Sequence, residues 1–417
     1  MPVNELLVKY DSYKNSIIFP KRIAAGILPA FAGAIKTWHN RGHISPLTLD
    51  FTKVEKAFAN GMLGIIATTN ELRRQNIKII LRLPSHEFSK EYFETTRWTY
   101  LLDPSFKDNY THNGNHFVKC FTDYTHIPDV VNQFMEIIMG HIQMPRDVLA
   151  ALEWSITEIC DNVVNHANSK IGGYIQVIAY PKHDLVAFTV ADAGKGILHS
   201  LQEGFPNLQS DLDAIEEAIK EGSTRNKNDG QGNGLTGTTR ITNMTGGSLH
   251  ILTGSASLLL ETAGQKSTQR SSHQYFNGTC ISGQIKMSHD FEIVNALSFG
   301  TSKYTPYTII DAKYEKQDED ALLFNMNEQL NGAGTRVAGK ELRFKLINLI
   351  TSKPGYPIYI DWQQTEIIVS SFADEFLGKL FVEIGKEKFE ATIKNINMKE
   401  VIEHIINKAI TERSSTG

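Results

Sequence analysis

The chain has 417 residues, a formal net charge of −4 at neutral pH and 41% hydrophobic residues. That length is sufficient for two or three domains with cores of their own, and the absence of a strong positive charge argues against nucleic acid as a general partner. The three cysteines, Cys120, Cys160 and Cys280, lie far apart and form no CxxC pair. We therefore expect neither a disulfide framework nor a zinc site, and we predict a cytoplasmic protein. The start of the chain lacks the features of a signal peptide, and no apolar run approaches a membrane span, so no membrane association is expected.

The first hundred residues alternate between strand-like and helix-like segments. We predict strand, helix, strand, helix and strand at residues 16–19, 23–41, 47–51, 60–74 and 77–83. Pro29 should interrupt or restart the first helix. Strand, helix and strand in this order indicate a parallel βαβ unit, which we assign to a domain of residues 12–105.

The segment Leu49-Asp50-Phe51, followed by a helix that opens at Asn60-Gly61, resembles the STAS domain of anti-anti-sigma factors. In the members of that family that are phosphorylated, a serine or threonine precedes the glycine, whereas this chain has Asn60. The resemblance therefore implies a packing or docking domain that accepts no phosphoryl group at this position.

Residues 106–128 are rich in Asp, Asn, Gly, His and Thr and are predicted to form a turn-rich connector. His112 and His116 lie four residues apart, a spacing that can hold a metal. Because no carboxylate or cysteine completes the set, we expect solvated loop histidines instead.

Residues 130–141 predict a helix, and a second amphipathic helix follows, with apolar residues at roughly helical spacing from Leu152 to Val164. Glu158 and Asn162 are four residues apart and share one face of it. Glu158 can orient or deprotonate a water molecule, and the amide oxygen of Asn162 is a ligand that Mg²⁺ accepts. The alternative is the solvated polar face of an ordinary surface helix.

A second cluster follows residues 185–191, an apolar run typical of a β-strand. Asp192 then lies at the end of the strand, where its carboxylate can accept a hydrogen bond from an exocyclic amine such as that of adenine. Gly194 and Gly196 allow the backbone to approach a flat ring. By itself this pattern is also typical of an ordinary turn after a strand.

A third cluster follows a polar, breaker-rich segment from Glu221 to Asp229, which predicts a mobile loop. Gly230, Gly232 and Gly234 then lead into a predicted helix at Leu235. A glycine-rich loop that opens a helix presents backbone N–H groups and a positive dipole end to phosphate. The alternative is a flexible connector.

The three clusters, in this order, resemble the N, G1 and G2 boxes of the GHKL ATPase superfamily, and residues 246–251 and 276–281 resemble the strands that close that fold. The resemblance implies an ATP-binding domain of residues 129–287, with ATP and Mg²⁺ as cofactors. It implies Glu158 as the base that activates water, Asn162 as the Mg²⁺ ligand and Asp192 as the reader of adenine. The remaining nucleotide-binding residues that it implies are Asn165, Gly194, Gly196, Gly230, Gly232, Gly234, Leu235 and Thr279, the last as support for the Asp192 contact. No Gly-x-x-x-x-Gly-Lys-[Ser/Thr] motif is present, so this is no Walker-type site.

Residues 288–408 differ in character from the preceding domain. We expect strand-like pieces in residues 291–313, including Tyr307 to Asp311, a helix from residue 334 to 350 and a strand at residues 356–362. A helix then begins at Ser370-Ser371-Phe372. This pattern resembles a second STAS-like domain, and residues 409–417 are predicted to be a frayed polar tail.

Ser370 and Ser371 lie at the predicted start of that helix, where free N–H groups and the helix dipole favour a phosphate. They are therefore candidate phosphoacceptors. The alternative that we favour is that one of them is an N-cap, with Asp374 or Glu375 completing the capping arrangement.

The predicted fold is a multidomain α/β protein: a central GHKL (Bergerat) α/β sandwich with a mixed sheet, flanked by two small STAS-like α/β domains. Three functions stay open: a slow ATPase whose loop closure gates domain or partner contacts, an anti-sigma-type serine kinase that phosphorylates Ser370, Ser371 or a partner's STAS domain, and a nucleotide sensor without turnover. We expect a protein partner, either a STAS-type or sigma/anti-sigma-like regulator or an operon-encoded effector, and a homodimer stays open. The pathway is also open between partner switching, stress signalling and a toxin or phage-defence operon.

Overall fold

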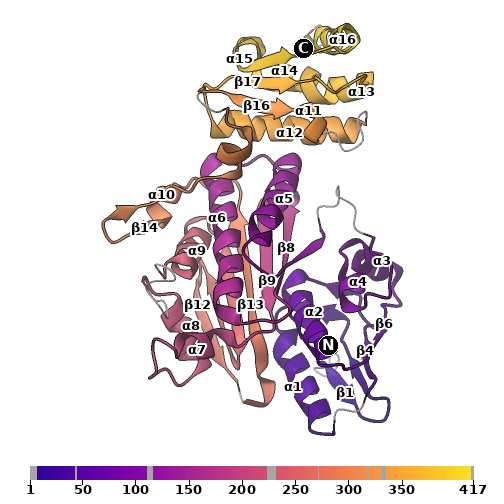
Figure 1. Ribbon diagram of the computed structural model, residues 1–417, viewed down its shortest axis with the longest axis vertical. Coiled ribbons are helices and arrows are strands. Elements are labelled where there is room, and N and C mark those ends of the chain that lie inside the picture. The colour runs from indigo at the N-terminus through magenta and orange to yellow at the C-terminus, as the bar shows by residue number, and fades with distance from the viewer. Residues whose placement is uncertain are drawn as a thin grey trace. The chain divides into compact units, whose positions relative to one another are not determined.

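The computed structural model describes residues 7–42, 45–109, 116–222, 232–270, 272–316, 319–329 and 335–414 (Figure 1). The chain divides into two compact units. The first unit consists of Met1–Val131 and Trp154–Tyr304, and the second of Asn132–Glu153 and Thr305–Gly417. Among the described residues, no helix combines the length and apolar character needed to cross a membrane.

The N-terminal part of the first unit contains a four-stranded sheet in the order β1-β2-β4-β6. The β2–β4 and β4–β6 pairs are parallel, which confirms the predicted βαβ arrangement, and β1 pairs with β2 antiparallel. Pro29 does not interrupt α1, because it is the third residue of the helix, where the missing N–H would have had no helical partner. The strands are β1 Lys9–Asp11, β2 Ser16–Ile18, β3 Arg22–Ile23, β4 Leu47–Asp50, β5 Lys56–Ala57 and β6 Ile79–Arg82, and the helices are α1 Ile27–His39, α2 Ala59–Arg74, α3 Glu87–Thr95 and α4 Trp98–Leu102.

The second sheet of the first unit has seven strands in the order β12-β11-β10-β13-β9-β8-β7. Every pairing between these strands is antiparallel, so the predicted mixed sheet is wrong. The reason is that short turns join β8 to β9, β10 to β11 and β11 to β12, and β13 lies between β9 and β10 and runs opposite to both. The strands are β7 Val118–Phe121, β8 Gly173–Tyr180, β9 Leu185–Asp192, β10 Ser248–Gly254, β11 Ala256–Glu261, β12 Gly264–Gln269 and β13 Phe276–Lys286.

Helices cover one face of this sheet, and α1 and α2 of the N-terminal part cover the other (Figure 1). Alternate residues of β9 point to opposite faces: Ala191 belongs to the apolar core that α1 and α2 share with the sheet, whereas Val190 and Asp192 line a pocket on the helical face. The packing is close, because a Cβ on Gly64 of α2 would lie 3.2 Å from the ring of Phe276. The N-terminal part and the sheet therefore share one hydrophobic core.

The helical face carries elements that lie far apart in the sequence. The helices α5 His126–His141 and α6 Arg146–Asn162 each pass from one compact unit into the other. The remaining elements of the first unit are the helical turns η2 Val163–Ala167, η3 Pro181–His183 and η4 Ser272–Gln274, the helices α7 Gly196–Leu201, α8 Asp211–Ala218, α9 Gly234–Met244 and α10 Ile293–Ala296, and the strands β14 Ser298–Phe299 and β15 Ser302–Lys303.

The second unit contains a parallel three-stranded sheet in the order β16-β17-β18, with helices packed against it. The helix expected to end at residue 350 is α12, and the strand expected at residues 356–362 is β17, while residue 334 lies outside the described residues. Helix α16 continues to Ser414, into the segment that we expected to fray. The elements are η5 Ile310–Tyr314, β16 Leu322–Asn325, α11 Met326–Gln329, α12 Arg336–Ser352, β17 Ile358–Asp361, α13 Ser370–Ala373, η6 Asp374–Gly378, α14 Lys379–Ile384, α15 Lys386–Thr392, β18 Ile393–Ile396 and α16 Glu400–Ser414.

The strand expected from Tyr307 to Asp311 is wrong, because this segment leads into the helical turn η5. Carboxylates satisfy the backbone donors that a neighbouring strand would have satisfied. Asp311 accepts hydrogen bonds from the backbone N–H and the hydroxyl of Thr308, both at 2.8 Å, and Glu153 accepts one from the N–H of Ile309 at 2.8 Å. Such local side-chain bonds compete with strand pairing.

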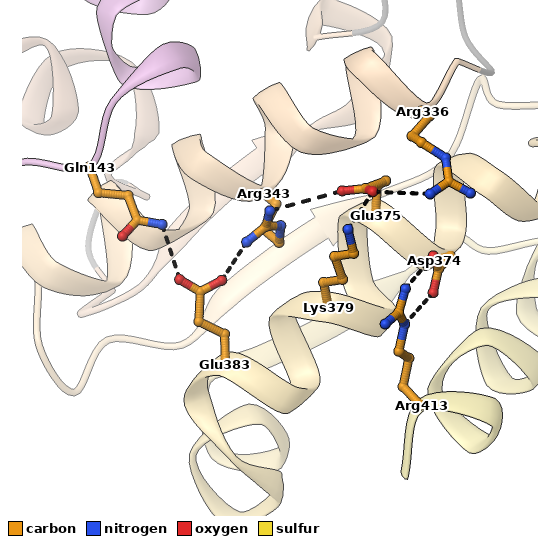
Figure 2. A network of polar contacts seen from close by, with 8 residues as sticks. All are labelled: Gln143, Arg336, Arg343, Asp374, Glu375, Lys379, Glu383 and Arg413. Carbon is orange, nitrogen blue, oxygen red and sulfur yellow. Dashed lines mark hydrogen bonds and ion pairs between the residues drawn. The ribbon is translucent and has the colours of Figure 1, made fainter. Parts of the chain in front are cut away.

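An ionic network crosses α12, η6, α14 and α16 of the second unit (Figure 2). Arg413 forms a two-pronged bond with Asp374 at 2.6 and 2.8 Å, and Arg343 bridges Glu375 and Glu383. Further cations at Glu375 are Arg336 and Lys379, and Gln143 donates to Glu383 at 3.0 Å.

This network also explains why the capping arrangement predicted at Ser370 and Ser371 is wrong. The N-cap of α13 is Val369, and no side chain caps the helix. Asp374 and Glu375 make ion pairs instead of completing a capping box.

Candidate functional site

A pocket of about 790 Å³ opens on the helical face of the seven-stranded sheet. It is lined by residues from α6, η2, β9, α7, α9, β13 and the β14–β15 segment. Of the residues that the sequence singled out, those that line the pocket are Glu158, Asn162, Asn165, Asp192, Gly196, Gly232, Gly234, Leu235 and Thr279. The structure therefore brings all three sequence clusters to one cavity.

Helix α6 supplies Glu158 and Asn162, because its opposite face is buried in the core. The helix ends at Asn162, and the π-helical turn η2, which contains Asn165, continues the pocket wall. Burial, reinforced by the nearby charge of Asp161, raises the pKa of Glu158 to about 7. A carboxyl group with such a pKa can take up and release a proton near neutral pH.

Asp192 ends β9 and is 1% exposed. Burial raises its pKa to about 7, although backbone N–H groups of Gly194 and Thr279 act in the opposite direction. The Gly194 bond is 2.7 Å long. The chain therefore holds a carboxyl group in a fixed orientation at the apolar end of a strand.

Two glycines after Asp192 allow close approaches of the backbone. Gly196 lines the pocket with a φ of +76°, and a Cβ there would lie 2.9 Å from the hydroxyl of Thr253. Gly194 does not line the pocket. A Cβ on it would lie 2.1 Å from the carbonyl oxygen of Ala167, so Gly194 allows β9 and η2 to pack together.

The N-terminus of α9 faces the same cavity. Gly234 is its first residue, and a Cβ there would lie only 2.4 Å from Oε2 of Glu158. The preceding residue, Asn233, does not cap the helix with its side chain, because its oxygen accepts a hydrogen bond from Gly222 at 3.1 Å. The side chain of Asn233 therefore does not occupy the N–H donors in the first turn of α9. Such donors at a helix N-terminus are the groups that bind an anion.

Part of the third cluster lies outside the described residues. Gly230 and most of the loop predicted from Glu221 to Asp229 fall within residues 223–231, so their expected roles stay predictions. The described ends of this segment are tied together, because Gly222 bonds to Asn233 and the hydroxyl of Thr236 donates to the carbonyl of Lys220 at 2.9 Å.

Several residues that line the pocket were not found from the sequence. Asp161 precedes Asn162 and could have been found as a polar neighbour on α6. No sequence motif marked Trp154 or the β14–β15 segment as part of the site, because only the packing of the chain brings them to the pocket. The missed residues of that segment that line the pocket are Phe299, Gly300, Lys303 and Tyr304.

The donor set of this pocket fits a magnesium nucleotide. The cavity volume is within the usual range for ligand sites. It offers a buried carboxyl acceptor at Asp192, N–H donors at the start of α9 and a hard amide oxygen at Asn162. Mg²⁺ commonly takes only a few protein ligands and completes its coordination with phosphate oxygens and water. Among the described residues, no group of three or more His, Cys, Asp and Glu side chains is arranged to hold a metal without such help.

The antiparallel sheet, its helical face and this pocket define an α/β domain with a cavity of ligand size. Residues 122–243 match the family model of the histidine kinase-like ATPase domain, and residues 338–403 match the STAS-like domain of unknown function (DUF4325). The chain therefore contains a GHKL-type ATPase domain and a C-terminal STAS-like domain, as the sequence motifs predicted. This combination fits an ATP-binding regulatory protein. No curated protein gave a significant match to the chain.

Neither matched range includes residues 12–105, so the N-terminal STAS-like domain stays a prediction. In the structure, Asn60 lies at the start of α2, and its carbonyl accepts a weak bond from Cys280 at 3.8 Å. This end of α2 is therefore packed against β13.

Proposed function

We propose that the protein binds Mg-ATP in this pocket and hydrolyses it slowly, with the nucleotide state controlling contacts to a domain or partner. The observation that carries the proposal is the meeting of Glu158, Asn162 and Asp192 with the N-terminus of α9 in one cavity. These residues come from three separate sequence clusters, and each supplies a different part of a nucleotide site.

In this proposal Asp192 holds the exocyclic amine of adenine, supported by the backbone N–H of Thr279. Asn165, Gly196 and Leu235 line the nucleotide, and the start of α9 at Gly234 binds phosphate oxygens. A magnesium ion held by Asn162 would neutralise phosphate charge. Glu158 takes a proton from the attacking water, since its pKa of about 7 keeps a useful fraction ionised.

The regulatory part of the proposal is supported by the domain composition. A STAS-like domain beside an ATPase domain suits a protein whose nucleotide state is read by a protein partner, of STAS or sigma/anti-sigma type or encoded in the same operon. We propose that residues 12–105 are a STAS-like docking domain, because α1 and α2 share a core with the ATPase sheet. A cytoplasmic location and a homodimer are part of the same hypothesis.

The test follows the γ-phosphate. Purified protein is incubated with Mg²⁺ and γ-labelled ATP, and free phosphate is separated from labelled protein. We expect free phosphate from the wild type, and retained ATP binding without phosphate release in Glu158→Ala. Undiminished release in Glu158→Ala would remove Glu158 from the mechanism, and stable bound ATP without release in the wild type would favour a nucleotide sensor without turnover.

A second candidate function, a protein serine kinase, is supported by the position of Ser370 and Ser371. Ser370 is exposed, Ser371 is half-buried, and they are the first two residues of a helical segment that no side chain caps. A phosphate on either residue would be favoured by the free N–H groups. Label on the protein that disappears in Ser370→Ala/Ser371→Ala, but not in the control Ser414→Ala, would establish this function. A protein that stays unlabelled with candidate STAS partners present would exclude it.

A further inference from the structure

The charge of the chain is unevenly distributed. Residues 12–105 contain 13 lysines and arginines and 7 aspartates and glutamates, a net charge of +6, although the whole chain carries −4. The rest of the chain therefore carries −10. Such an asymmetry favours an electrostatic partner for the charged region. The sides of α1 and α2 that are packed against the seven-stranded sheet are not available to that partner.

Six of these cations lie at one end of the four-stranded sheet. Strands β2, β4 and β6 are parallel, and Ile18, Asp50 and Arg82 at their ends are in register, so the segments that follow them leave the same edge. We call the surface formed by residues 20–22, 50–57 and 82–90 the basic end. Its cations, all exposed, are Lys21, Arg22, Lys53, Lys56, Arg82 and Lys90, and its carboxylates are Asp50, Glu55 and Glu87.

Hydrogen bonds hold the three segments of the basic end together. The N–H of Glu55 donates to the carbonyl of Lys21 at 2.8 Å. The N–H of Ser85 donates to the carbonyl of Thr52 at 3.1 Å, and the hydroxyl of Ser89 donates to the carbonyl of Glu55 at 2.7 Å. The basic end is therefore one ordered surface, and a partner that binds it does not have to pay the entropy of ordering three separate loops.

The carboxylates of the basic end neutralise only part of its positive charge. Glu55 pairs with Lys21 at 2.9 Å, and Asp50, which is buried, lies 3.5 Å from Arg82. Among the described residues, no carboxylate lies within ion-pair distance of the other four cations, which are Arg22, Lys53, Lys56 and Lys90. These four charges are thus available to an anionic partner.

The basic end also contains two features that are typical of a binding surface. Arg22 and Lys56 occupy partner positions where β3 and β5 pair, and like charges at such positions repel each other unless an anion lies close to both. Phe88, the second residue of α3, is 78% exposed and adjoins Ser89, which is bonded to Glu55. Aromatic rings and arginines are enriched at protein interfaces, where large rings serve as anchors.

We propose that the basic end is a docking surface for an acidic segment of a partner protein. In this complex Asp or Glu side chains of the partner pair with Lys53, Lys56 and Lys90, and an apolar side chain of the partner covers Phe88. The inference goes beyond the proposed function, because it depends on no residue of the nucleotide pocket.

A protein segment fits this surface better than a nucleic acid does. Glu55 and Glu87 lie within the basic end, and the rest of the chain carries −10, so both the surface itself and the field around it would repel a phosphate backbone. A peptide that mixes carboxylates with apolar side chains can place its charges beside the lysines and its apolar groups on Phe88.

The test measures the binding of labelled peptides to the full chain by fluorescence anisotropy. The probe is a peptide that alternates Glu and Asp with Leu and Phe. One control peptide has Lys in place of every Glu and Asp, and another has Ser in place of every Leu and Phe. We expect the acidic apolar probe to bind most tightly, and its affinity to fall as salt is added, since exposed charges are screened.

Substitutions at the basic end test the assigned contacts. Lys53→Ala/Lys56→Ala/Lys90→Ala should weaken binding of the probe about tenfold, because three exposed ion pairs are lost. Phe88→Ala should weaken it about fivefold and should reduce the difference between the probe and the peptide that contains Ser. All four side chains are exposed, so these changes should leave folding intact.

The matched control is Lys14→Ala/Lys78→Ala. These two exposed lysines belong to the same domain and directly precede β2 and β6, so they lie at the opposite edge of the parallel strands. We expect the control variant to bind the probe as the wild type does. All variants should also bind ATP as the wild type does, because none of the changed residues lines the nucleotide pocket.

Three results would overturn the proposal. The first is equal affinity for the probe in the triple lysine variant and in the control variant, or no binding of the probe by the wild type. The second is tighter binding of oligouridine than of the probe, with the same loss in the triple variant, because the surface would then bind nucleic acid. The third is a wild-type dimer that the triple variant converts to a monomer in sedimentation velocity, because the occupant would then be a second copy. A wild type that binds the probe but no ATP would leave this inference standing and overturn the proposed function.

Discussion

Two regions of this protein bury carboxyl groups, and the pKa values of most of these groups shift in opposite directions in the two regions. In the pocket of the first unit, burial raises the pKa of both Glu158 and Asp192 to about 7. In the second unit, Lys345 contacts Glu136 at 2.5 Å and Lys313 contacts it at 3.0 Å. Burial alone would raise the pKa of Glu136, but these lysines together hold it below its ordinary value.

Two other acids of the second unit follow the same rule, whereas burial raises the pKa of Glu153 in that unit to about 7. Arg413 holds the pKa of Asp374 below its usual range, and burial of Asp311 is outweighed by its bonds with Lys353 and Thr308. A carboxylate that is paired with a cation is fixed in its ionised form and serves packing. A buried carboxyl group without a cationic partner is costly to maintain, and such groups are concentrated at functional sites. The difference thus distinguishes the carboxyl groups of the pocket from those of the second unit that are paired with cations.

The largest expected effect concerns Glu158. Glu158→Gln removes the group that accepts the proton, so we expect the rate of ATP hydrolysis to fall by about a thousandfold. ATP affinity should change little. In the wild type, the rate should rise with pH through about 7, because the ionised form is the active base. Steady-state phosphate release measured from pH 5.5 to 8.5 checks both; a flat profile would show that Glu158 does not act as a base.

The next effect concerns binding. Asp192→Ala combined with Asn162→Ala removes the acceptor for adenine and the oxygen for Mg²⁺, and each lost interaction leaves a polar group of the ligand without a partner. We expect ATP affinity to fall by about a hundredfold, equivalent to about 3 kcal/mol, with modest effect on folding. Calorimetry measures the affinity, and circular dichroism serves as the folding control. Intact binding would mean that the nucleotide lies elsewhere.

In the second unit, the prediction is a loss of stability without a loss of nucleotide binding. Arg343→Ala removes a largely buried guanidinium that bridges Glu375 and Glu383 (Figure 2). We expect the free energy of unfolding of this unit to fall by about 2 kcal/mol. The control is Lys386→Ala, whose pair with Glu390 is exposed and should contribute less than about 0.5 kcal/mol. Urea unfolding with and without ATP separates the two readouts, and a large loss of ATP affinity would break the division of roles.

The smallest effect is the pH dependence of stability. The pKa of Asp192 in the folded protein, about 7, lies above its ordinary value of 3.8. The folded state therefore binds this proton more tightly than the unfolded state does. The resulting stabilisation is fully present below about pH 4 and is lost as the pH rises to about 7.

Asp192→Asn cannot ionise, so it should remove this contribution. We expect its melting temperature to fall less than that of the wild type between pH 5 and 8, with a difference of about 2–4 °C. Thermal unfolding followed at several pH values checks this; identical slopes for both proteins would mean that Asp192 titrates normally.

The sequence alone located the ATPase domain and the C-terminal STAS-like domain, and it found nine of the residues that line the pocket. It could do so because Glu158 and Asn162 depend only on helical spacing, and Asp192 and the glycines depend on the local conformation at the end of a strand and the start of a helix. Local patterns also gave the parallel βαβ unit near the N-terminus.

Other features depended on contacts between residues that are distant in the chain. The order of the seven antiparallel strands and the docking of α1 and α2 on the sheet follow from such contacts. The helical turn at Asp311 does so in part, through the hydrogen bond from Ile309 to Glu153. The arrival of Lys303 at the pocket also follows from such contacts, because Arg240 and Glu221, which lie some 60 to 80 residues earlier, hold the β14–β15 hairpin in place. A residue's local pattern determines its helix or strand, but tertiary packing determines which charges meet and which are left buried without a partner.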